Sequence, residues 1–233
     1  MAEILTIAHT DGGTAGVLAD ASPEIALSLE QWIPAEGGQP ELPLSEYKGL
    51  LILGGDENIH ETDRYPYLED EFALLSDWLE SGRPVFGVCL GAQMIAHVTG
   101  GSVFEAPARE FGWIDIDVLP AGLDDPVTGF GEQRLSALLW HQYACEPPAE
   151  ATILARNEVC VQSFRLGEAW AFQHHPEVDD AILDHWLEPV LNDSEGPERR
   201  RLAELVEAER GARMPPWNEY GQELFRRFVK RCR

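Results

Sequence analysis

The chain has 233 residues, 44% of them hydrophobic, and carries a formal net charge of −24 at pH 7. This length and composition suit one compact globular domain, and no apolar run is long enough to cross a membrane. Residues 1–197 hold 35 of the 41 acidic residues, and so acidic a body argues against nucleic-acid binding by the main domain.

The N-terminus begins with an apolar stretch that predicts a first strand, and it lacks the basic start of a signal peptide. The four cysteines, at positions 89, 145, 160 and 232, show neither a paired spacing nor a metal-binding pattern. We therefore expect a cytoplasmic protein with no metal site and no cofactor.

Alternating and continuous apolar runs predict most of the regular structure. The expected strands are 3–9, 50–53, 84–88, 101–104, 112–118, 135–139, 151–155, 159–164 and 168–173. A helix is predicted at 67–80, because apolar residues recur there at helical spacing. Residues 101–164 are richer in strands than in helices. The pattern predicts an α/β fold: a doubly wound, mostly parallel sheet with helices on both faces, an antiparallel edge extension and a C-terminal helical appendage.

The C-terminal part of the chain differs in composition from the rest. Residues 192–197 are typical of a linker, so we place a main domain at 1–191 and an appendage at 192–233. Helices are predicted at 198–210 and 218–231, separated by Pro215-Pro216-Trp217. Two interpretations stay open: these helices pack on the main domain, or they dock an acceptor enzyme or a second subunit.

The segment from Pro84 to Gln93 combines an apolar strand, a Gly-x-Cys-x-Gly turn around Cys89, and a helix-like continuation. This pattern is typical of a nucleophile elbow, which lifts one reactive side chain to the top of a sheet. Gly87 and Gly91 are needed because a side chain there would collide with the neighbouring strand or helix. A helix that begins after the cysteine favours the thiolate. The alternative is a cysteine that only packs, as most do.

A partner for Cys89 lies far downstream, where a short apolar strand at 169–173 runs into His174-His175-Pro176-Glu177. A cysteine nucleophile needs an imidazole to take its proton, and the imidazole needs an acceptor that fixes its tautomer. His175 and Glu177 could fill these roles, with Pro176 stiffening the link. A His-rich turn that caps the next helix is the alternative.

Together, the stretches Gly87–Gln93 and Phe172–Glu177 resemble the class I (triad) glutamine amidotransferase family, in particular stand-alone members similar to the glutaminase domain of GMP synthase. The resemblance covers roughly residues 1–190. It implies a Cys-His-Glu triad that hydrolyses the side-chain amide of glutamine through a glutamyl thioester and releases ammonia. By this resemblance Cys89 is the nucleophile, His175 the general base and acid, and Glu177 the orienting carboxylate.

The resemblance also implies an oxyanion hole and a substrate pocket. In the family a Gly-Gly turn at the place of Gly54-Gly55 supplies a backbone N–H, so Gly55 and Leu90 are the expected donors. A plain strand-to-loop turn is the alternative. The expected substrate-binding residues are Gly54, Gln93, Gln162, Ser163 and Phe164.

Three positions depart from the common family pattern. The stretch Trp140–Tyr143 occupies the place of a Trp/His-Gly-Asp-like loop in many relatives, and Gln142 and Tyr143 depart from that pattern, which puts the identity of the substrate in question. His174 stands where relatives often carry an aromatic residue, and it is expected either at the pocket mouth or exposed.

The expected activity is glutamine hydrolysis, with ammonia passed to an unidentified acceptor, for example an acceptor synthetase subunit. A γ-glutamyl peptidase or hydrolase would present the same γ-carbonyl to Cys89, so the triad does not distinguish the two. A non-catalytic scaffold or regulatory subunit is the alternative of another class, and the intact Cys-His-Glu set argues against it. No nucleic-acid or membrane partner is expected, and a homo-oligomer is left open. A working thiol suits the reducing cytoplasm.

Overall fold

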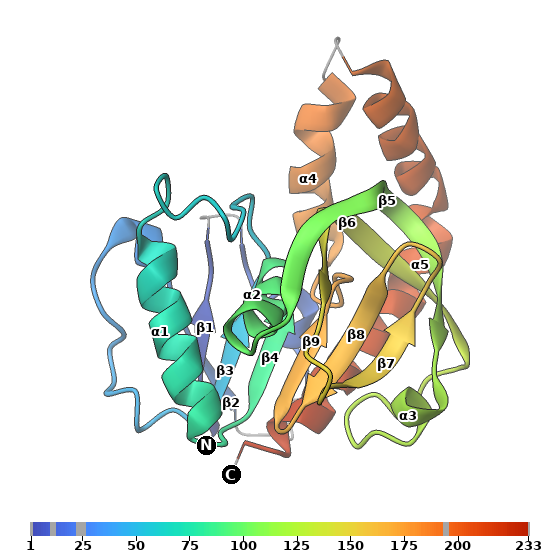
Figure 1. Cartoon of the computed structure of the whole chain (residues 1–233). Helices are drawn as coiled ribbons and strands as arrows, with labels where there is room; N and C mark the ends of the chain where they lie inside the picture. Colours follow the sequence, from blue (N-terminus) through green and yellow to red (C-terminus); the bar gives the residue numbers. More distant parts are fainter. Residues whose placement is uncertain (1, 10–12, 22–26, 193–195, 233) are drawn as a thin grey trace.

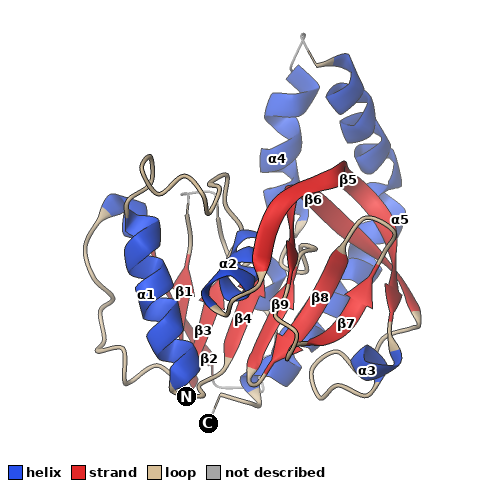
Figure 2. Ribbon diagram, viewed as in Figure 1, coloured by secondary structure: helices blue, strands red, loops and turns tan. Residues whose placement is uncertain are grey.

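The computed structural model describes residues 2–9, 13–21, 27–192 and 196–232. At its centre is a nine-stranded mixed sheet with the order β2-β1-β3-β4-β9-β8-β7-β5-β6 (Figures 1 and 2). The strands are β1 Ala2–Ile7, β2 Leu27–Trp32, β3 Gly49–Ile52, β4 Val85–Val88, β5 Ser102–Val118, β6 Arg134–Glu146, β7 Thr152–Arg156, β8 Val161–Leu166 and β9 Ala169–Phe172. The helices are α1 Tyr67–Glu80, α2 Leu90–Val98, α3 Pro120–Leu123, α4 Asp180–Asn192 and α5 Pro197–Val229, with 3-10 turns η1 Gly16–Leu18 and η2 Pro34–Glu36.

One half of the sheet is parallel: β2, β1, β3, β4 and β9 pair side by side in the same direction. Every residue of β3, β4 and β9 is buried, which explains their continuous apolar runs. These strands were predicted within two residues. The edge strand β2 was not predicted, because half of its residues, Ser28, Glu30 and Gln31, are polar.

The other half of the sheet is antiparallel and larger than the predicted edge extension. From β9 it continues through β8, β7, β5 and β6. The prediction of separate strands at 101–104 and 112–118 was wrong, because β5 runs through both. The residues between them include the charged Arg109 and the proline Pro107, and β6 pairs with β5 on both sides of 106–109, at Glu105 and at Glu110, with a register shift between the two.

Helices cover both faces of the sheet, as predicted (Figures 1 and 2). On one face α1 and α2 pack against the sheet; the buried cluster there includes Leu5, Leu50, Ile52, Leu75, Trp78, Val85 and Ile95. On the other face lies α5; that cluster includes Ile4, Leu51, Phe86, Phe172, Leu224, Phe225 and Phe228. The predicted bounds of α1, 67–80, are confirmed. No described helix is both long enough and apolar enough to span a bilayer.

The prediction of two C-terminal helices was wrong, because α5 is continuous from Pro197 to Val229 with Pro215 and Pro216 inside it. Both prolines are exposed, so the carbonyls that lose a partner there can bind water. The flanking Met214 and Trp217 are buried and hold the helix against the core.

The predicted linker falls between α4 and α5. Residues 193–195 of it lie outside the described residues. The division into a unit at 1–191 and another at 192–233 stays a prediction.

Candidate functional site

Cys89 lies between the end of β4 and the first residue of α2. Its backbone has φ +50° and ψ −102°, and within the described ranges it is the single non-glycine residue with positive φ. A residue with a Cβ adopts this conformation at a cost, which is typical of functional turns such as the nucleophile elbow. The Cys89 N–H donates to the Phe172 carbonyl at 2.7 Å and ties the turn to β9. The predicted strand–turn–helix geometry is confirmed.

The two glycines of the turn allow strand and helix to approach closely. A Cβ on Gly91 would lie 2.4 Å from the Ile52 carbonyl oxygen, and one on Gly87 would lie 2.7 Å from the Gly91 carbonyl oxygen. Neither contact is sterically allowed, and both partners are backbone atoms. The sequence prediction that side chains would collide here is therefore correct.

His175 follows β9 and faces the turn around Cys89. Its Nδ1 lies 2.7 Å from Glu177 Oε1, and both side chains are about 5% exposed or less. Its backbone is fixed on two sides: the N–H donates to the Leu138 carbonyl at 3.0 Å, and the carbonyl accepts from Trp217 Nε1 at 2.9 Å. Helix α5 and strand β6 together hold the imidazole in place.

The electrostatic surroundings of His175 favour its protonated form. Burial lowers its pKa, but the charges of Glu177 and Cys89 outweigh burial and raise the pKa above 6.5. Because Nδ1 is engaged by Glu177, Nε2 is the nitrogen available to Cys89. This Nε2 makes no hydrogen bond within the described part of the chain. A cysteine, an imidazole and a carboxylate therefore lie together with the tautomer fixed.

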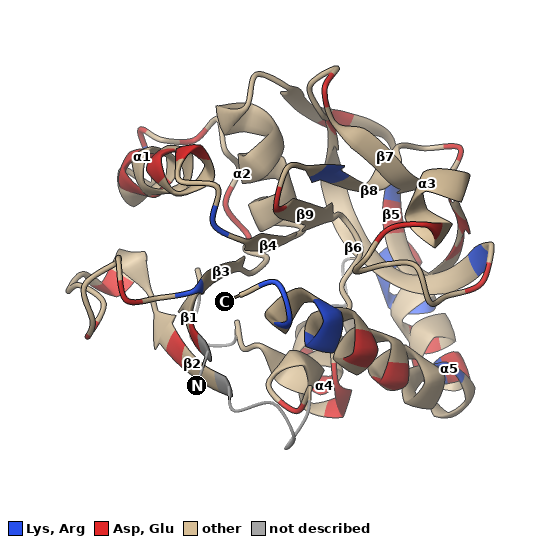
Figure 3. Ribbon diagram, turned by 90° about the horizontal axis from the view of Figure 1, so that it is seen from below, with Lys and Arg blue, Asp and Glu red and all other residues tan. Residues whose placement is uncertain are grey.

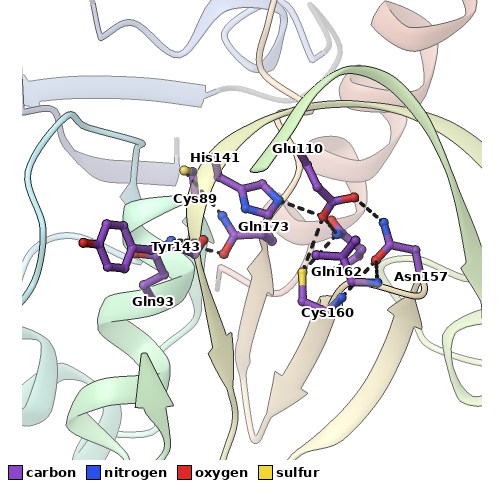
Figure 4. Close-up of polar contacts among 10 residues, drawn as sticks. Cys89, Gln93, Glu110, His141, Tyr143, Asn157, Cys160, Gln162 and Gln173 are labelled. Atoms are coloured by element: carbon purple, nitrogen blue, oxygen red, sulfur yellow. Dashed lines mark hydrogen bonds and ion pairs between the residues drawn. The ribbon is translucent and has the colours of Figure 1, made fainter. Parts of the chain in front are cut away.

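The Cys89 sulfur accepts a hydrogen bond from Gln173 Nε2 at 3.5 Å (Figure 4). Gln173 is itself oriented by Gln93, whose Nε2 donates to Gln173 Oε1 at 3.2 Å and to the Tyr143 carbonyl at 3.0 Å. Sequence reasoning did not single out Gln173, although it directly precedes His174. The side-chain amides of Gln93 and Gln173 are thus linked, and Gln173 donates a hydrogen bond to the Cys89 sulfur.

A cavity of about 310 Å³ opens over Cys89 and is within the usual size range of small-molecule pockets. Of the predicted site residues it is lined by Gly54, Gly55, Cys89, His175 and Glu177. Its far wall was not predicted; it consists of Ile182, His185, Trp186, Pro189 and Val190 from α4 and Arg199 from α5. The amphipathic pattern that follows Glu177 would have indicated a helix near the site, but not which face it turns to the cavity.

The other predicted substrate-binding residues do not line this cavity. Gln93 uses its amide nitrogen within the protein, and Phe164 is part of the core beside α1 and α2. Gln162 is fully buried and donates to Glu110 at 2.8 Å, and Ser163 borders a separate small cavity. Their assignment as substrate contacts stays a prediction, as does that of Leu90 as an oxyanion donor at the first residue of α2.

Beside the cavity lies a second cluster with a cysteine, a histidine and a carboxylate: Cys160, His141 and Glu110 (Figure 4). Its three ligand-type atoms lie within 4.8 Å of one another, and among the described residues this is the one group that could hold a metal ion. Glu110 already accepts hydrogen bonds from Asn157 and Gln162, at 2.6 and 2.8 Å, and pairs with His141 at 3.2 Å.

These donors supply hydrogen bonds to the Glu110 carboxylate from within the protein. Burial raises the pKa of Glu110, but the bonds from His141, Asn157 and Cys160 lower it overall. Burial and the charge of Glu110 raise the pKa of Cys160, which keeps it a thiol. None of the three side chains lines the cavity, so we regard the cluster as a support for the strands beside the site.

The expectation that His174 lies at the pocket mouth or on the surface was wrong. Its exposed fraction is 1%, and it is enclosed by Phe172, Trp217 and Tyr220. The side chain does not line the cavity over Cys89 but packs into this aromatic cluster.

The family model for glutamine amidotransferase class-I matches residues 27–186, more than half of the chain. The chain belongs to the class-I glutamine amidotransferase family. The matched segment contains the Cys89 turn, the His175–Glu177 pair and most of the sheet, so the resemblance stated from the sequence is confirmed.

Relatives of this amidotransferase-family chain support the same assignment. It is 33% identical over 167 residues to the GMP synthase [glutamine-hydrolyzing] of Aeropyrum pernix, covering 69% of this chain and 31% of the relative. The chain therefore spans about a third of that enzyme. It is 27% identical over 188 residues to the glutamine amidotransferase-like protein YfeJ of Salmonella typhimurium, covering 78% and 77% of the two chains.

A solved structure extends the likeness to the whole fold. The crystal structure of a glutamine amidotransferase from Thermotoga maritima superimposes with a TM-score of 0.84 at 29% identity, covering 98% of both chains. A glutamine amidotransferase from Methylobacillus flagellatus, at 22% identity, has a TM-score of 0.82 and shows the fold alone. The mixed α/β sheet with its helices is thus the fold of this amidotransferase family.

Proposed function

We propose that the protein is an enzyme that hydrolyses the side-chain amide of glutamine through Cys89 and releases ammonia. The observation that carries the proposal is the strained turn at Cys89 over a cavity that His175 and Glu177 also line. A scaffold would have no use for a cysteine held in a costly backbone conformation beside an oriented imidazole. The alternative of a non-catalytic subunit is therefore disfavoured.

The first half-reaction forms a thioester. The Cys89 sulfur, which has given its proton to His175 Nε2, attacks the γ-carbon of glutamine as a thiolate. The carbonyl oxygen becomes an oxyanion, for which the N–H groups of Gly55 and Leu90 are the proposed donors. When the intermediate collapses, His175 returns the proton to the leaving nitrogen, and ammonia departs from the glutamyl thioester.

The second half-reaction restores the enzyme. A water molecule attacks the thioester carbon and gives a proton to His175 Nε2. The same two N–H groups would hold the new oxyanion, and collapse expels the Cys89 sulfur, which regains its proton from His175. Glutamate is released. Throughout, Glu177 keeps the proton of Nδ1 in place and stabilises the imidazolium.

The glutamine analogue 6-diazo-5-oxo-L-norleucine tests this proposal. We expect one covalent adduct on Cys89, detected by intact mass and peptide mapping, together with loss of ammonia release from glutamine. Cys89→Ala should form no adduct and release no ammonia, and its loss of kcat should be at least about 10³-fold because the nucleophile is gone. Cys232→Ala is the matched control, because it removes another buried thiol that does not line the cavity.

Two results would contradict the proposal. One is the absence of an adduct at Cys89 when both the wild type and Cys232→Ala are folded. The other is ammonia release by Cys89→Ala at the wild-type rate.

A second candidate, hydrolysis of γ-glutamyl amides, is favoured by the shape of the cavity. The cavity continues from Cys89 to α4 and to Arg199 at the start of α5, whereas the leaving group of glutamine is only ammonia. An arginine there could pair with the carboxylate of a leaving amino acid. Comparing kcat/KM for glutamine with that for γ-glutamyl dipeptides decides between the two: a value at least tenfold higher for the dipeptides would make the protein a γ-glutamyl hydrolase.

We also propose a partner that accepts the ammonia. The chain matches only part of a GMP synthase, and another fold relative is described as a putative synthase subunit, so an acceptor synthetase subunit is the partner we propose. Co-purification of the chain with such a subunit, or stimulation of glutaminase turnover by it, would support this. A homo-oligomer and a cytoplasmic location also stay proposals.

A further inference from the structure

A second buried imidazole lies behind the Gly54-Gly55 turn. His9 follows β1, and its Nδ1 lies 3.2 Å from the Gly54 carbonyl oxygen. Its Nε2 lies 3.0 Å from Glu71 Oε2 on α1, and both side chains are fully buried. His9 and Glu71 do not line the cavity over Cys89, whereas Gly54 and Gly55 do. The mechanism above makes no use of this pair.

The hydrogen-bonding chemistry assigns the protons. A carbonyl oxygen only accepts hydrogen bonds, so Nδ1 must carry a proton and donate it to Gly54. Nε2 and the Glu71 carboxylate share one further proton. The two groups are either an imidazolium and a carboxylate, or a neutral imidazole and a carboxylic acid. In both cases the Nδ1–H donates to Gly54 and Glu71 fixes the ring.

The surroundings of the ring favour the charged form. Burial lowers the pKa of His9, but the hydrogen bond and charge of Glu71 and the charge of Glu57 raise it overall. Glu57 in turn accepts a hydrogen bond from Tyr67 at 2.5 Å. The groups that act on His9 are thus the carboxylates of Glu71 and Glu57 and the Gly54 carbonyl.

The Gly54 carbonyl and the Gly55 N–H belong to the same peptide unit. The described chain contains no cis peptide bond, and in a trans peptide the C=O and the N–H point in opposite directions. A carbonyl held by His9 therefore turns the Gly55 N–H away from His9. Two consecutive glycines would otherwise let this peptide rotate freely, because neither residue has a Cβ to restrict it.

The geometry points to His9 and Glu71 as positioning residues that set the orientation of the Gly54–Gly55 peptide and so present the Gly55 N–H as an oxyanion donor. A charge-assisted hydrogen bond to the carbonyl also polarises the peptide and strengthens the N–H on its other side. This inference rests on the proposed function, in which the Gly55 N–H binds the oxyanion. His9 touches no substrate and is not a catalytic residue.

Two variants of His9 separate this role from a general support of the fold. His9→Asn places an amide nitrogen near the position of Nδ1 and keeps a donor for Gly54. His9→Gln places its amide near the position of Nε2 and keeps the bond to Glu71. A third variant, Glu71→Gln, keeps the side-chain shape and can donate to Nε2, which leaves the Nδ1–H on Gly54.

We expect kcat for glutamine or a γ-glutamyl dipeptide to fall by about 10²-fold in His9→Gln, with KM within about threefold of the wild type, because oxyanion donors act on the transition state. In His9→Asn and Glu71→Gln, kcat should stay within about tenfold. Alkylation of Cys89 by iodoacetamide forms no oxyanion, so its rate should stay within about twofold in all three variants. Each variant is first checked for folding by thermal unfolding.

Equal kcat values for His9→Gln and His9→Asn would overturn the inference. So would an alkylation rate that falls in parallel with kcat, which is the signature of a general structural role. If His9→Gln does not fold, His9→Asn and Glu71→Gln still test the inference. Both variants keep a donor to the Gly54 carbonyl, so a loss of kcat beyond about tenfold in either one contradicts it.

Crystal structures of the wild type, His9→Asn and His9→Gln test the positioning without any activity. The Gly54–Gly55 peptide should keep its orientation in His9→Asn and rotate in His9→Gln. An unchanged peptide in His9→Gln refutes the inference. If the wild type cleaves neither glutamine nor γ-glutamyl dipeptides, the proposed function fails. The orientation of the Gly54–Gly55 peptide in these crystal structures then still tests the positioning role of His9.

Discussion

His174 shows how strongly the position of a single residue depends on its surroundings. Its neighbour His175 lines the cavity with Nδ1 paired to Glu177, while His174 points into an aromatic cluster where neither of its ring nitrogens makes a well-formed hydrogen bond. Burial and the charge of His175 lower the pKa of His174 to about 3. An imidazole in that place is neutral and poorly paired, and it costs the folded state free energy.

Replacing His174 by Phe should therefore stabilise the protein. At pH 7 we expect the free energy of unfolding to rise by about 1 kcal/mol, because an unpaired buried polar group is removed. Below pH 6.5 the gain should grow, by at most about 1.4 kcal/mol per pH unit, because unfolded wild-type His174 takes up a proton and the folded one does not until about pH 3. Urea unfolding at pH 7, 6 and 5 measures this.

The sign of that pH dependence is the critical observation. A lowered folded-state pKa makes wild-type stability fall as the pH drops from 6.5. If the difference between His174→Phe and the wild type stays constant from pH 7 to 5, His174 is not the group responsible.

At the scale of elements, α5 connects the C-terminal part of the chain to the candidate site. The helix lies directly against the His175–Glu177 segment, where Trp217 and Asn218 donate to the carbonyls of His175 and Val178 at 2.9 Å. Gly221 makes the contact close: a Cβ there would lie 2.1 Å from the Pro176 carbonyl oxygen. The helix can therefore approach this segment only at a glycine.

Two glycines of the same helix make a matched pair of variants. Gly221→Ala should push α5 away from Pro176, lower the free energy of unfolding by about 1–3 kcal/mol and reduce kcat, because His175 and Glu177 flank Pro176. Gly211→Ala meets no atom within 4 Å and should raise stability by about 0.5–1 kcal/mol through helix propensity. Thermal unfolding and ammonia release measure both. Equal stability of the two variants would show that α5 does not pack against Pro176 as described.

At the scale of the whole molecule, charge is distributed unevenly. Acidic residues are spread over α1, α5 and the loops, while several of the few basic residues lie on α5 (Figure 3). Some of these make specific pairs: Arg210 bonds Asp180 and Asp184 of α4 at 2.7 Å. With a formal net charge of −24, however, repulsion between like charges dominates the long-range field.

Salt should therefore stabilise the protein. Raising NaCl from about 0.05 to 1 M shortens the Debye length to about 3 Å and screens this repulsion. We expect Tm to rise by several degrees, each 1 kcal/mol corresponding to about 2–4 °C for a chain of this size. A Tm that falls with salt would mean that local pairs such as Arg210–Asp180 outweigh the repulsion, and Arg210→Gln would then lose this salt dependence.

Local sequence pattern was sufficient to predict several elements and the turn around Cys89. The continuous apolar runs of β3, β4 and β9 are typical of short strands buried on both faces, and the spacing of α1 is that of an amphipathic helix. The Gly-x-Cys-x-Gly turn needs its glycines for steric reasons that the structure confirms. The motifs around Cys89 and His175 were enough to recognise the family.

Other features arise from contacts between distant segments and could not be predicted from local pattern. Strand β5 spans both predicted segments because β6 pairs with it on either side of residues 106–109, and α5 continues through Pro215 and Pro216 because Met214 and Trp217 are buried on its inner face. The hydrogen bonds from Gln93 through Gln173 to Cys89 and from Glu71 through His9 to Gly54 join residues 45 to 84 positions apart, and α4 closes the cavity from still further along the chain. No local pattern contains that information, because burial and hydrogen-bond partners across such separations are set by the packing of the whole sheet.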